Sequence, residues 1–184
     1  MNRFEPWASL IVAAALSAIF MLIWQSQLVA PSSPAGTGFD RERAFAALSR
    51  LLKEERPHIT GSPENQVIRD RIVEELKSHG YTPEIQAAFQ CAPPDRYPGC
   101  TQVENIVAVH KGTSGGKAVL ATAHYDSVAA GPGVADDGAG TAVVLELARA
   151  LAGRQTKNDV VLLITDGEET GLRGALAFAE RHPL

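Results

Sequence analysis

Two short apolar runs that flank a helical segment constrain the fold most strongly. Residues 118–123 (AVLATA) and 160–165 (VVLLIT) have the character of buried strands, and residues 138–151 between them carry apolar side chains at helical spacing. A strand, a helix and a strand of these lengths predict a right-handed βαβ unit, whose two parallel strands are covered on both faces. A further helix is expected over residues 171–181. The predicted fold class is therefore α/β.

Two more helices are expected ahead of this unit. Residues 39–56 carry apolar side chains at helical spacing and end before Pro57, a residue that disfavours helix at the position preceding it. A second amphipathic helix is expected to begin at Ser62, which is followed by proline, and to stop at Gly80.

Three strand candidates follow these helices, at residues 82–89, 103–110 and 117–123. The glycine-rich stretch 112–116 between the last two resembles a hairpin loop, which predicts that these two strands pair. With the βαβ unit, they predict a mixed, largely parallel sheet covered by helices.

The N-terminal part of the chain predicts a membrane anchor. Residues 7–24 contain no charge and span about 27 Å as a helix, close to the thickness of the hydrocarbon core. A slight positive excess predicts that residues 1–6 form a short cytoplasmic tail, with residues 25–38 as a tether rich in proline, serine and glycine. A cleaved signal peptide is the alternative. Residues 39–184 are expected to form the N-terminal part of an extracytoplasmic domain on a single-pass membrane protein.

The charge balance and the two cysteines bear on partners and compartment. Lys and Arg number 17 against 21 Asp and Glu, and there is no basic stripe, so nucleic acid is not expected as a partner. Cys91 and Cys100 close a short loop and are candidates for a disulfide in an oxidising compartment, with two unpaired thiols as the alternative.

The chemistry-bearing residues lie where the two strands of the βαβ unit end. Ligands of open α/β sheets bind at the carboxyl ends of the strands, and one histidine with six carboxylates is expected to converge there. These are His124, Asp126, Asp136, Asp137, Asp166, Glu168 and Glu169. So many carboxylates repel one another unless cations neutralise them, and imidazole with carboxylate oxygens suits a hydrolytic zinc site.

Each of these motifs alone has a plainer structural interpretation. A single His-x-Asp after a strand is more often a hydrogen-bonded pair, Asp136-Asp137-Gly138 more often a turn with a helix N-cap, and Glu168-Glu169 more often a solvated first turn. Their joint occurrence around one βαβ unit favours the metal site.

At these residues the sequence resembles the co-catalytic di-zinc exopeptidases related to bacterial leucyl aminopeptidase and aminopeptidase Y. The resemblance rests on three blocks: HYD at 124–126, PGVADDGAG at 132–140 and DGEETGLRGA at 166–175. RPH at 56–58 and TGS at 60–62 further resemble the membrane-bound branch that includes endoplasmic-reticulum metallopeptidase. The resemblance implies a zinc exopeptidase, phosphorylase/hydrolase-like fold.

The resemblance also implies a role for each residue. His124 would bind one zinc ion, Glu169 the other, and Asp136 would bridge both. Asp126 would hold His124 in its ligating orientation, and Glu168 would act as the general base on a metal-activated water. In such enzymes the peptide bond after the bridging aspartate is cis, so we expect a cis bond between residues 136 and 137.

The predicted function is that of a zinc-dependent, aminopeptidase-type metallopeptidase acting on peptide substrates, with two zinc ions in the complete domain. The resemblance calls for one further aspartate and one further histidine ligand downstream of Leu184, so the 184-residue chain by itself is expected to bind zinc weakly and to be inactive. The alternatives are a non-catalytic membrane-anchored ectodomain of the same fold and a glutaminyl-cyclase-like enzyme, which shares the fold but lacks the second metal.

Overall fold

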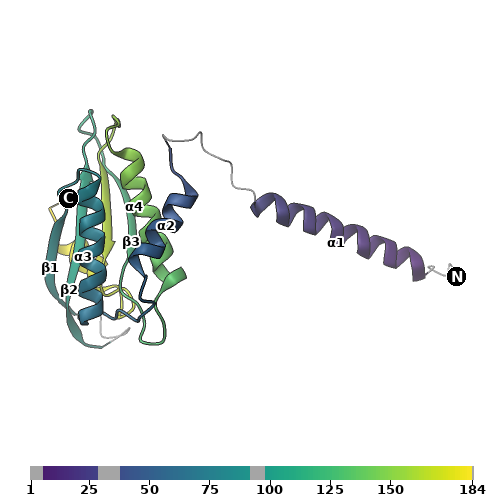
Figure 1. Ribbon diagram of the computed structural model, residues 1–184, viewed down its shortest axis with the longest axis horizontal. Coiled ribbons are helices and arrows are strands. Elements are labelled where there is room, and N and C mark those ends of the chain that lie inside the picture. Colours follow the sequence, from purple (N-terminus) through teal and green to yellow (C-terminus); the bar gives the residue numbers. More distant parts are fainter. Residues whose placement is uncertain (1–5, 29–37, 92–97, 184) are drawn as a thin grey trace. The chain divides into compact units, whose positions relative to one another are not determined.

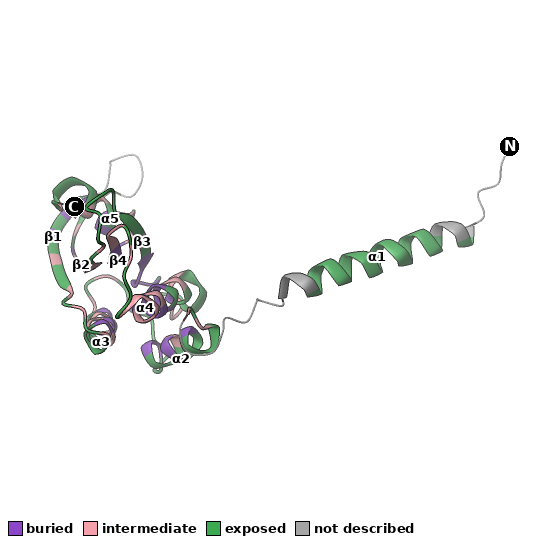
Figure 2. Ribbon diagram, turned by 90° about the horizontal axis from the view of Figure 1, so that it is seen from above, coloured by how far each residue is buried: buried purple, intermediate pink, exposed green. Residues whose placement is uncertain are grey.

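The computed structural model describes residues 6–28, 38–91 and 98–183, and the chain divides into two units, residues 1–35 and 36–184. In the first unit, helix α1 (Pro6–Leu28) covers the predicted anchor at residues 7–24, and its described side chains are exposed (Figures 1 and 2). Within the three described ranges, no helix combines the length and the apolar character needed to cross a membrane. Most of the predicted tether and tail lies outside the described residues.

The second unit contains four helices and four strands among its described residues, in the order that the sequence predicts. They are α2 (Arg41–Leu51), α3 (Pro63–Ser78), β1 (Glu84–Cys91), β2 (Cys100–His110), β3 (Val119–His124), α4 (Ala139–Leu151), β4 (Val160–Thr165) and α5 (Arg173–Arg181). An irregular turn, Val134–Gly138, leads into α4.

Side-chain caps explain where the first two helices of this unit begin. The Asp40 carboxylate accepts a hydrogen bond from the backbone N–H of Arg43, at 3.1 Å, and the Ser62 hydroxyl accepts one from Asn65, also at 3.1 Å. Each cap satisfies an N–H group that lacks a partner within the helix. α2 ends at Leu51, five residues before the predicted end, where the chain turns through Glu55 in a left-handed backbone conformation.

The sheet has the strand order β1-β2-β4-β3, which corrects two predictions. β3 and β4 are parallel, which confirms the strand–helix–strand unit, but β1 with β2 and β2 with β4 are antiparallel. The sheet is therefore mixed and not largely parallel. β2 and β3 do not form a hairpin, because β4 lies between them.

The connection from β2 to β3 crosses the chain that leads into β4, which explains why the hairpin prediction is wrong. The backbone N–H of Ser114 donates to the Lys157 carbonyl at 2.9 Å, and that of Gly112 donates to the Asp159 carboxylate at 2.7 Å. A Cβ at Gly112 would lie 2.3 Å from the Asn158 carbonyl carbon, so only glycine permits this approach. The loop thus packs on the residues preceding β4 and leaves room for that strand.

Helices cover both faces of the sheet. Figure 2 shows α2, α3 and α4 on one side and α5 on the other. Side chains of β4 alternate accordingly: Leu162 and Ile164 belong to the main core with α3 and α4, whereas Val161 and Leu163 pack on the side of Phe178 from α5. Because both faces are buried, β4 is almost continuously apolar.

Cys91 and Cys100 form a disulfide, as predicted, so neither thiol is free. They are cross-strand partners at the end of the β1–β2 ladder, with their Cα atoms 3.9 Å apart. The bond closes a loop whose residues 92–97 are outside the described part of the chain.

Candidate active site at the carboxyl ends of β3 and β4

The parallel pairing of β3 and β4 brings the predicted site residues together. His124 ends β3 opposite Thr165, the last residue of β4, so the segments that follow the two strands leave the sheet side by side. The His124 Nε2 atom lies 3.1 Å from Asp136 Oδ1 and 3.8 Å from Glu168 Oε2. The His124 side chain is 9% exposed and that of Asp136 84% exposed, so a buried imidazole faces carboxylates that solvent can reach.

Asp126 joins the two strand ends. Its carboxylate is 1% exposed and accepts hydrogen bonds from the backbone N–H groups of Glu168, at 3.0 Å, and Glu169, at 3.1 Å. It also lies 3.4 Å from His124 Nδ1, although the nearer oxygen to that nitrogen is the Asp126 backbone carbonyl, at 3.1 Å. Asp126 therefore fixes the Glu168–Glu169 turn as well as facing His124, a role that sequence analysis missed.

Asp137 serves the backbone of the site. Its carboxylate accepts hydrogen bonds from the N–H of His124, at 3.2 Å, and from that of Gly140, at 3.0 Å, so it caps α4 and ties that helix to the end of β3. A Cβ at Gly140 would lie 2.1 Å from the Asp137 carboxylate, which explains the glycine. The peptide bond between Asp136 and Asp137 is cis, as expected.

Asp166 is a buried structural acid. It is 2% exposed, and its carboxylate accepts hydrogen bonds from the Asn65 side chain and from the backbone N–H of Glu104, both at 3.2 Å. Burial, and then the nearby charge of Asp126, raise the pKa of Asp166 to about 7. The structure thus separates Asp166 from the solvent-facing carboxylates with which the sequence grouped it.

The remaining electrostatics reflect crowding of charge at the strand ends. Burial opposes protonation of His124, but its hydrogen bonds and charge interactions with Asp126, Asp136 and Glu168 prevail and raise its pKa to about 9. Burial, and then the charge of Asp136, raise the pKa of Glu169. Both raised pKa values reflect the negative charge of the surrounding carboxylates, which favours a cation among them.

The donor atoms suit zinc in kind: an imidazole nitrogen and carboxylate oxygens, with no thiolate. His124 Nε2 and Asp136 Oδ1 already face each other, and the other ring nitrogen of His124 is held from behind by Asp126. Over the described part of the chain, no group of three or more His, Cys, Asp or Glu side chains is arranged to hold a metal ion.

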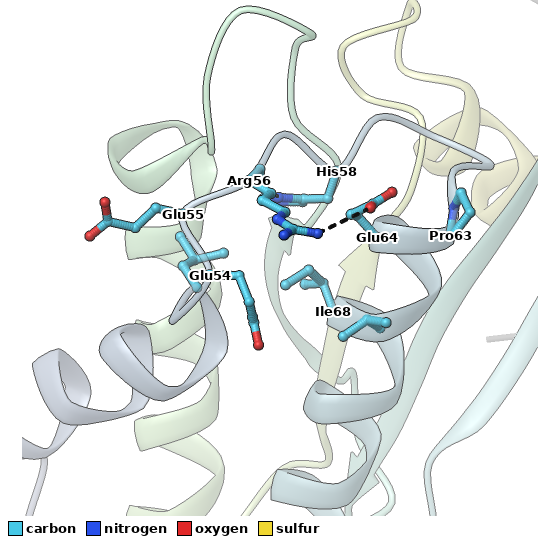
Figure 3. Close-up of a pocket in the computed structure, with 9 residues that line it drawn as sticks. Glu54, Glu55, Arg56, His58, Pro63, Glu64 and Ile68 are labelled. Atoms are coloured by element: carbon cyan, nitrogen blue, oxygen red, sulfur yellow. Dashed lines mark hydrogen bonds and ion pairs between the residues drawn. The ribbon is translucent and has the colours of Figure 1, made fainter.

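A separate cavity of about 250 Å³ lies between the end of α2 and the start of α3 (Figure 3). The ion pair between Arg56 and Glu64, at 4.0 Å, runs across it, and Leu52 and Ile68 provide apolar walls. None of the carboxylates at the ends of β3 and β4 lines this cavity.

Solved structures of other proteins share the fold of the α/β domain. Glutaminyl cyclase from Porphyromonas gingivalis superposes with a TM-score of 0.68 and 22% identity over 79% of this chain and 55% of its own. A zinc-dependent exopeptidase from Parabacteroides distasonis gives a TM-score of 0.66 and 19% identity over 80% of this chain and 57% of its own. The α/β domain therefore has the fold of the zinc-dependent exopeptidases.

The sequence profile described as Peptidase family M28 matches residues 105–184, the segment that holds every candidate catalytic and metal-binding residue. Residues 105–184 of this chain thus match the model of peptidase family M28, which confirms the resemblance to zinc exopeptidases.

Two curated relatives extend the similarity upstream. A vacuolar membrane protease of Schizosaccharomyces japonicus is 30% identical over 175 residues, and endoplasmic reticulum metallopeptidase 1 of Rattus norvegicus is 30% identical over 185 residues. These matches cover 90% and 92% of this chain but only 20% of each relative, so the chain spans about one fifth of their length.

Proposed function

We propose that the second unit of this chain carries the catalytic side chains of a zinc-dependent metallo-exopeptidase that hydrolyses peptide bonds. The observation that supports this most directly is the buried imidazole of His124, whose Nε2 faces the carboxylates of Asp136 and Glu168 while Asp126 lies behind its Nδ1. An imidazole oriented by a buried carboxylate, facing other carboxylates at the end of a strand, is the arrangement of a catalytic metal ligand.

In this proposal His124 would hold one zinc ion and Glu169 a second, and Asp136 would serve as a ligand of both. Zinc bound there would supply Lewis-acid polarisation of water and of the scissile carbonyl. The Asp136 side chain is 84% exposed, so its carboxylate is accessible from solvent, whereas His124 and Asp126 are buried.

Glu168 is assigned the proton transfer. Its backbone N–H is anchored on Asp126, but its side chain is 36% exposed and lies 3.8 Å from His124 Nε2, so the carboxylate is placed at the rim with its backbone fixed. From there it would take a proton from water and deliver it to the leaving amine, a step that contributes about 10²- to 10⁴-fold in such enzymes.

We also propose that α1 holds the domain at a membrane, with the domain on the extracytoplasmic side. The support is the uncharged sequence of residues 7–24, the disulfide between Cys91 and Cys100, and the name of the vacuolar membrane protease relative. The test is extraction of membranes that contain the expressed chain with carbonate, after which an anchored chain stays in the membrane pellet. An N-terminal sequence that begins near residue 31 would instead show that a signal peptide has been cleaved.

The catalytic proposal is tested on an intact, zinc-loaded protein that supplies the further aspartate and histidine ligands expected downstream of Leu184. It is given unblocked peptides, and the products are identified by mass spectrometry. Release of N-terminal residues that is at least about 100-fold slower in Glu168→Gln supports the exopeptidase. Substrates with an N-terminal glutamine separate the glutaminyl-cyclase-like alternative, because cyclisation releases ammonia and leaves every peptide bond intact. Hydrolysis at an unchanged rate in Glu168→Gln would remove Glu168 from the mechanism.

A further inference from the structure

The chain that enters α3 contacts both buried acids behind the candidate active site. We call residues 58–65 the α3 entry segment; Figure 3 shows its His58 on the chain that precedes α3, and its Pro63 and Glu64 in the first turn of that helix. The Thr60 hydroxyl donates a hydrogen bond to Asp126 Oδ2 at 3.1 Å, and the Asn65 amide donates to Asp166 Oδ1 at 3.2 Å. Thr60 and Asp126 are 66 positions apart in the sequence, and Asn65 and Asp166 are 101 positions apart.

The entry segment is itself held firmly against the loop that follows β3. The backbone N–H of His58 donates to the Ser127 hydroxyl at 2.9 Å, and the N–H of Ser127 donates to the His58 carbonyl at 3.3 Å. Asn65 is 2% exposed, and its amide also lies 3.4 Å from the His58 carbonyl. The Thr60 hydroxyl is thus presented to Asp126 from a fixed backbone.

Asp126 depends on that hydroxyl for a complete set of hydrogen bonds. Oδ1 accepts from the N–H of Glu168, and Oδ2 accepts both from the N–H of Glu169 and from Thr60. A buried carboxylate keeps one orientation only while its donors hold it, because each bond to a charged group restricts its rotation. Loss of the Thr60 donor therefore removes the one hydrogen bond that holds this carboxylate from the side of the α3 entry segment, and leaves it to the two N–H groups of the turn and to His124.

We propose that Thr60 is a positioning residue of the active site: acting through Asp126, it fixes the turn that presents Glu168 and Glu169. The catalytic significance of this role rests on the proposed function, whereas the mechanical link from Thr60 to the turn does not. The α3 entry segment thereby becomes part of the site, although no residue of it faces His124.

The test is hydrogen–deuterium exchange on the full 184-residue chain, followed in the peptides that contain residues 166–172. Thr60→Val keeps the side-chain shape and removes the hydroxyl, so we expect the Glu168 and Glu169 amides to exchange about tenfold faster. Thr60→Ser restores the donor and should return exchange to the wild-type rate. Thr113→Val is the matched control, because Thr113 lies in the loop between β2 and β3 and its hydroxyl donates an exposed hydrogen bond to the Thr156 carbonyl, ahead of β4.

The exchange pattern decides the proposal. Faster exchange confined to the turn, with β4 and α4 unchanged and with rescue by serine, supports it. Unchanged exchange in Thr60→Val, failure of serine to rescue, or equal loosening of β4 and α4 would overturn it, since the last would show only a general loss of stability.

A zinc titration of the same variants separates this inference from the proposed function. Thr60→Val should weaken zinc binding about tenfold if the turn carries a ligand, on the scale of other residues that orient ligands. If Thr60→Val shows the exchange effect but the wild-type chain binds no zinc, the proposed function fails and the positioning role of Thr60 stands.

Discussion

Replacing Asn105 with alanine should destabilise the domain more than any exposed polar substitution in it. Asn105 lies on β2 and is fully buried. Its amide donates to the Gly174 carbonyl at 2.8 Å and to Gln86 Oε1 at 2.9 Å, and its carbonyl oxygen accepts from the N–H of Asp166 at 3.1 Å. One side chain therefore joins β1, β2, the turn after β4 and the start of α5.

The magnitude follows from the groups that lose a hydrogen bond in Asn105→Ala. The N–H of Asp166 is in a buried residue and loses its acceptor, which costs about 1–3 kcal/mol. The carbonyl of Gly174 is also in a buried residue, but it lies in α5 and keeps its place in the helix, so it loses one hydrogen bond at about 0.5–1.5 kcal/mol. Gln86 is partly exposed and can bond to water instead. We expect a loss of about 3 kcal/mol in the free energy of unfolding, out of a total on the order of 10 kcal/mol for a domain of this size.

Urea denaturation followed by circular dichroism measures this loss, with Asn158→Ala as the matched control. Asn158 makes one exposed hydrogen bond, to the Lys117 carbonyl at 2.8 Å, so its removal should cost about 0.5–1 kcal/mol. The free energy of unfolding should fall with urea concentration at the same slope in both variants, and the variants should differ in the urea concentration at the midpoint of unfolding. A difference between them of less than about 1 kcal/mol would refute the assignment of Asn105 as a buried junction.

Two further predictions concern charge. Asp126→Asn replaces one acceptor oxygen with a donor amide, so it should lose at least one charge-assisted bond to the Glu168–Glu169 turn and about 2 kcal/mol of stability, measured by urea midpoint; an unchanged midpoint would contradict this. The second prediction concerns Glu54, which accepts a hydrogen bond from Arg71 that lowers the pKa of Glu54 to about 2. The stability from this pair is therefore present above pH 4.5 and is lost as the pH falls toward 2. Glu54→Gln should flatten the acid side of the stability profile in that range, and an acid side as steep as that of wild type would be evidence against it.

The sequence was sufficient for local elements but not for their pairing. β4 occupies the predicted residues 160–165 because an apolar run bounded by polar residues is a strong strand signal. The apparent hairpin at residues 112–116 was misleading, since glycine content marks a loop but does not say which strands it joins. Only the contacts of Gly112 with the residues before β4 decide the strand order.

The candidate site was predictable in composition and only partly in arrangement. That His124 and the acids after β4 meet at one edge followed from the parallel pairing of two strands. The sequence could not predict that Asp126 accepts a hydrogen bond from the backbone of Glu168, or that Thr60 donates one to Asp126. These contacts join segments that are far apart along the chain, and no periodic pattern in the sequence marks them. The polar residues around Ser62 looked like an ordinary helix start, which they also are.

A zinc titration of the full 184-residue chain tests the central claim most directly, by competition with a chromophoric chelator. His124→Ala should weaken zinc binding at least tenfold, whereas Glu168→Gln, which changes a proton carrier and not a ligand, should stay within about threefold of wild type. His79→Ala is the histidine control, since His79 follows the end of α3 and lies beside Glu75, at 3.6 Å. Equal affinities in wild type, His124→Ala and His79→Ala, or a loss in Glu168→Gln as large as that in His124→Ala, would contradict the assignment of ligand and base.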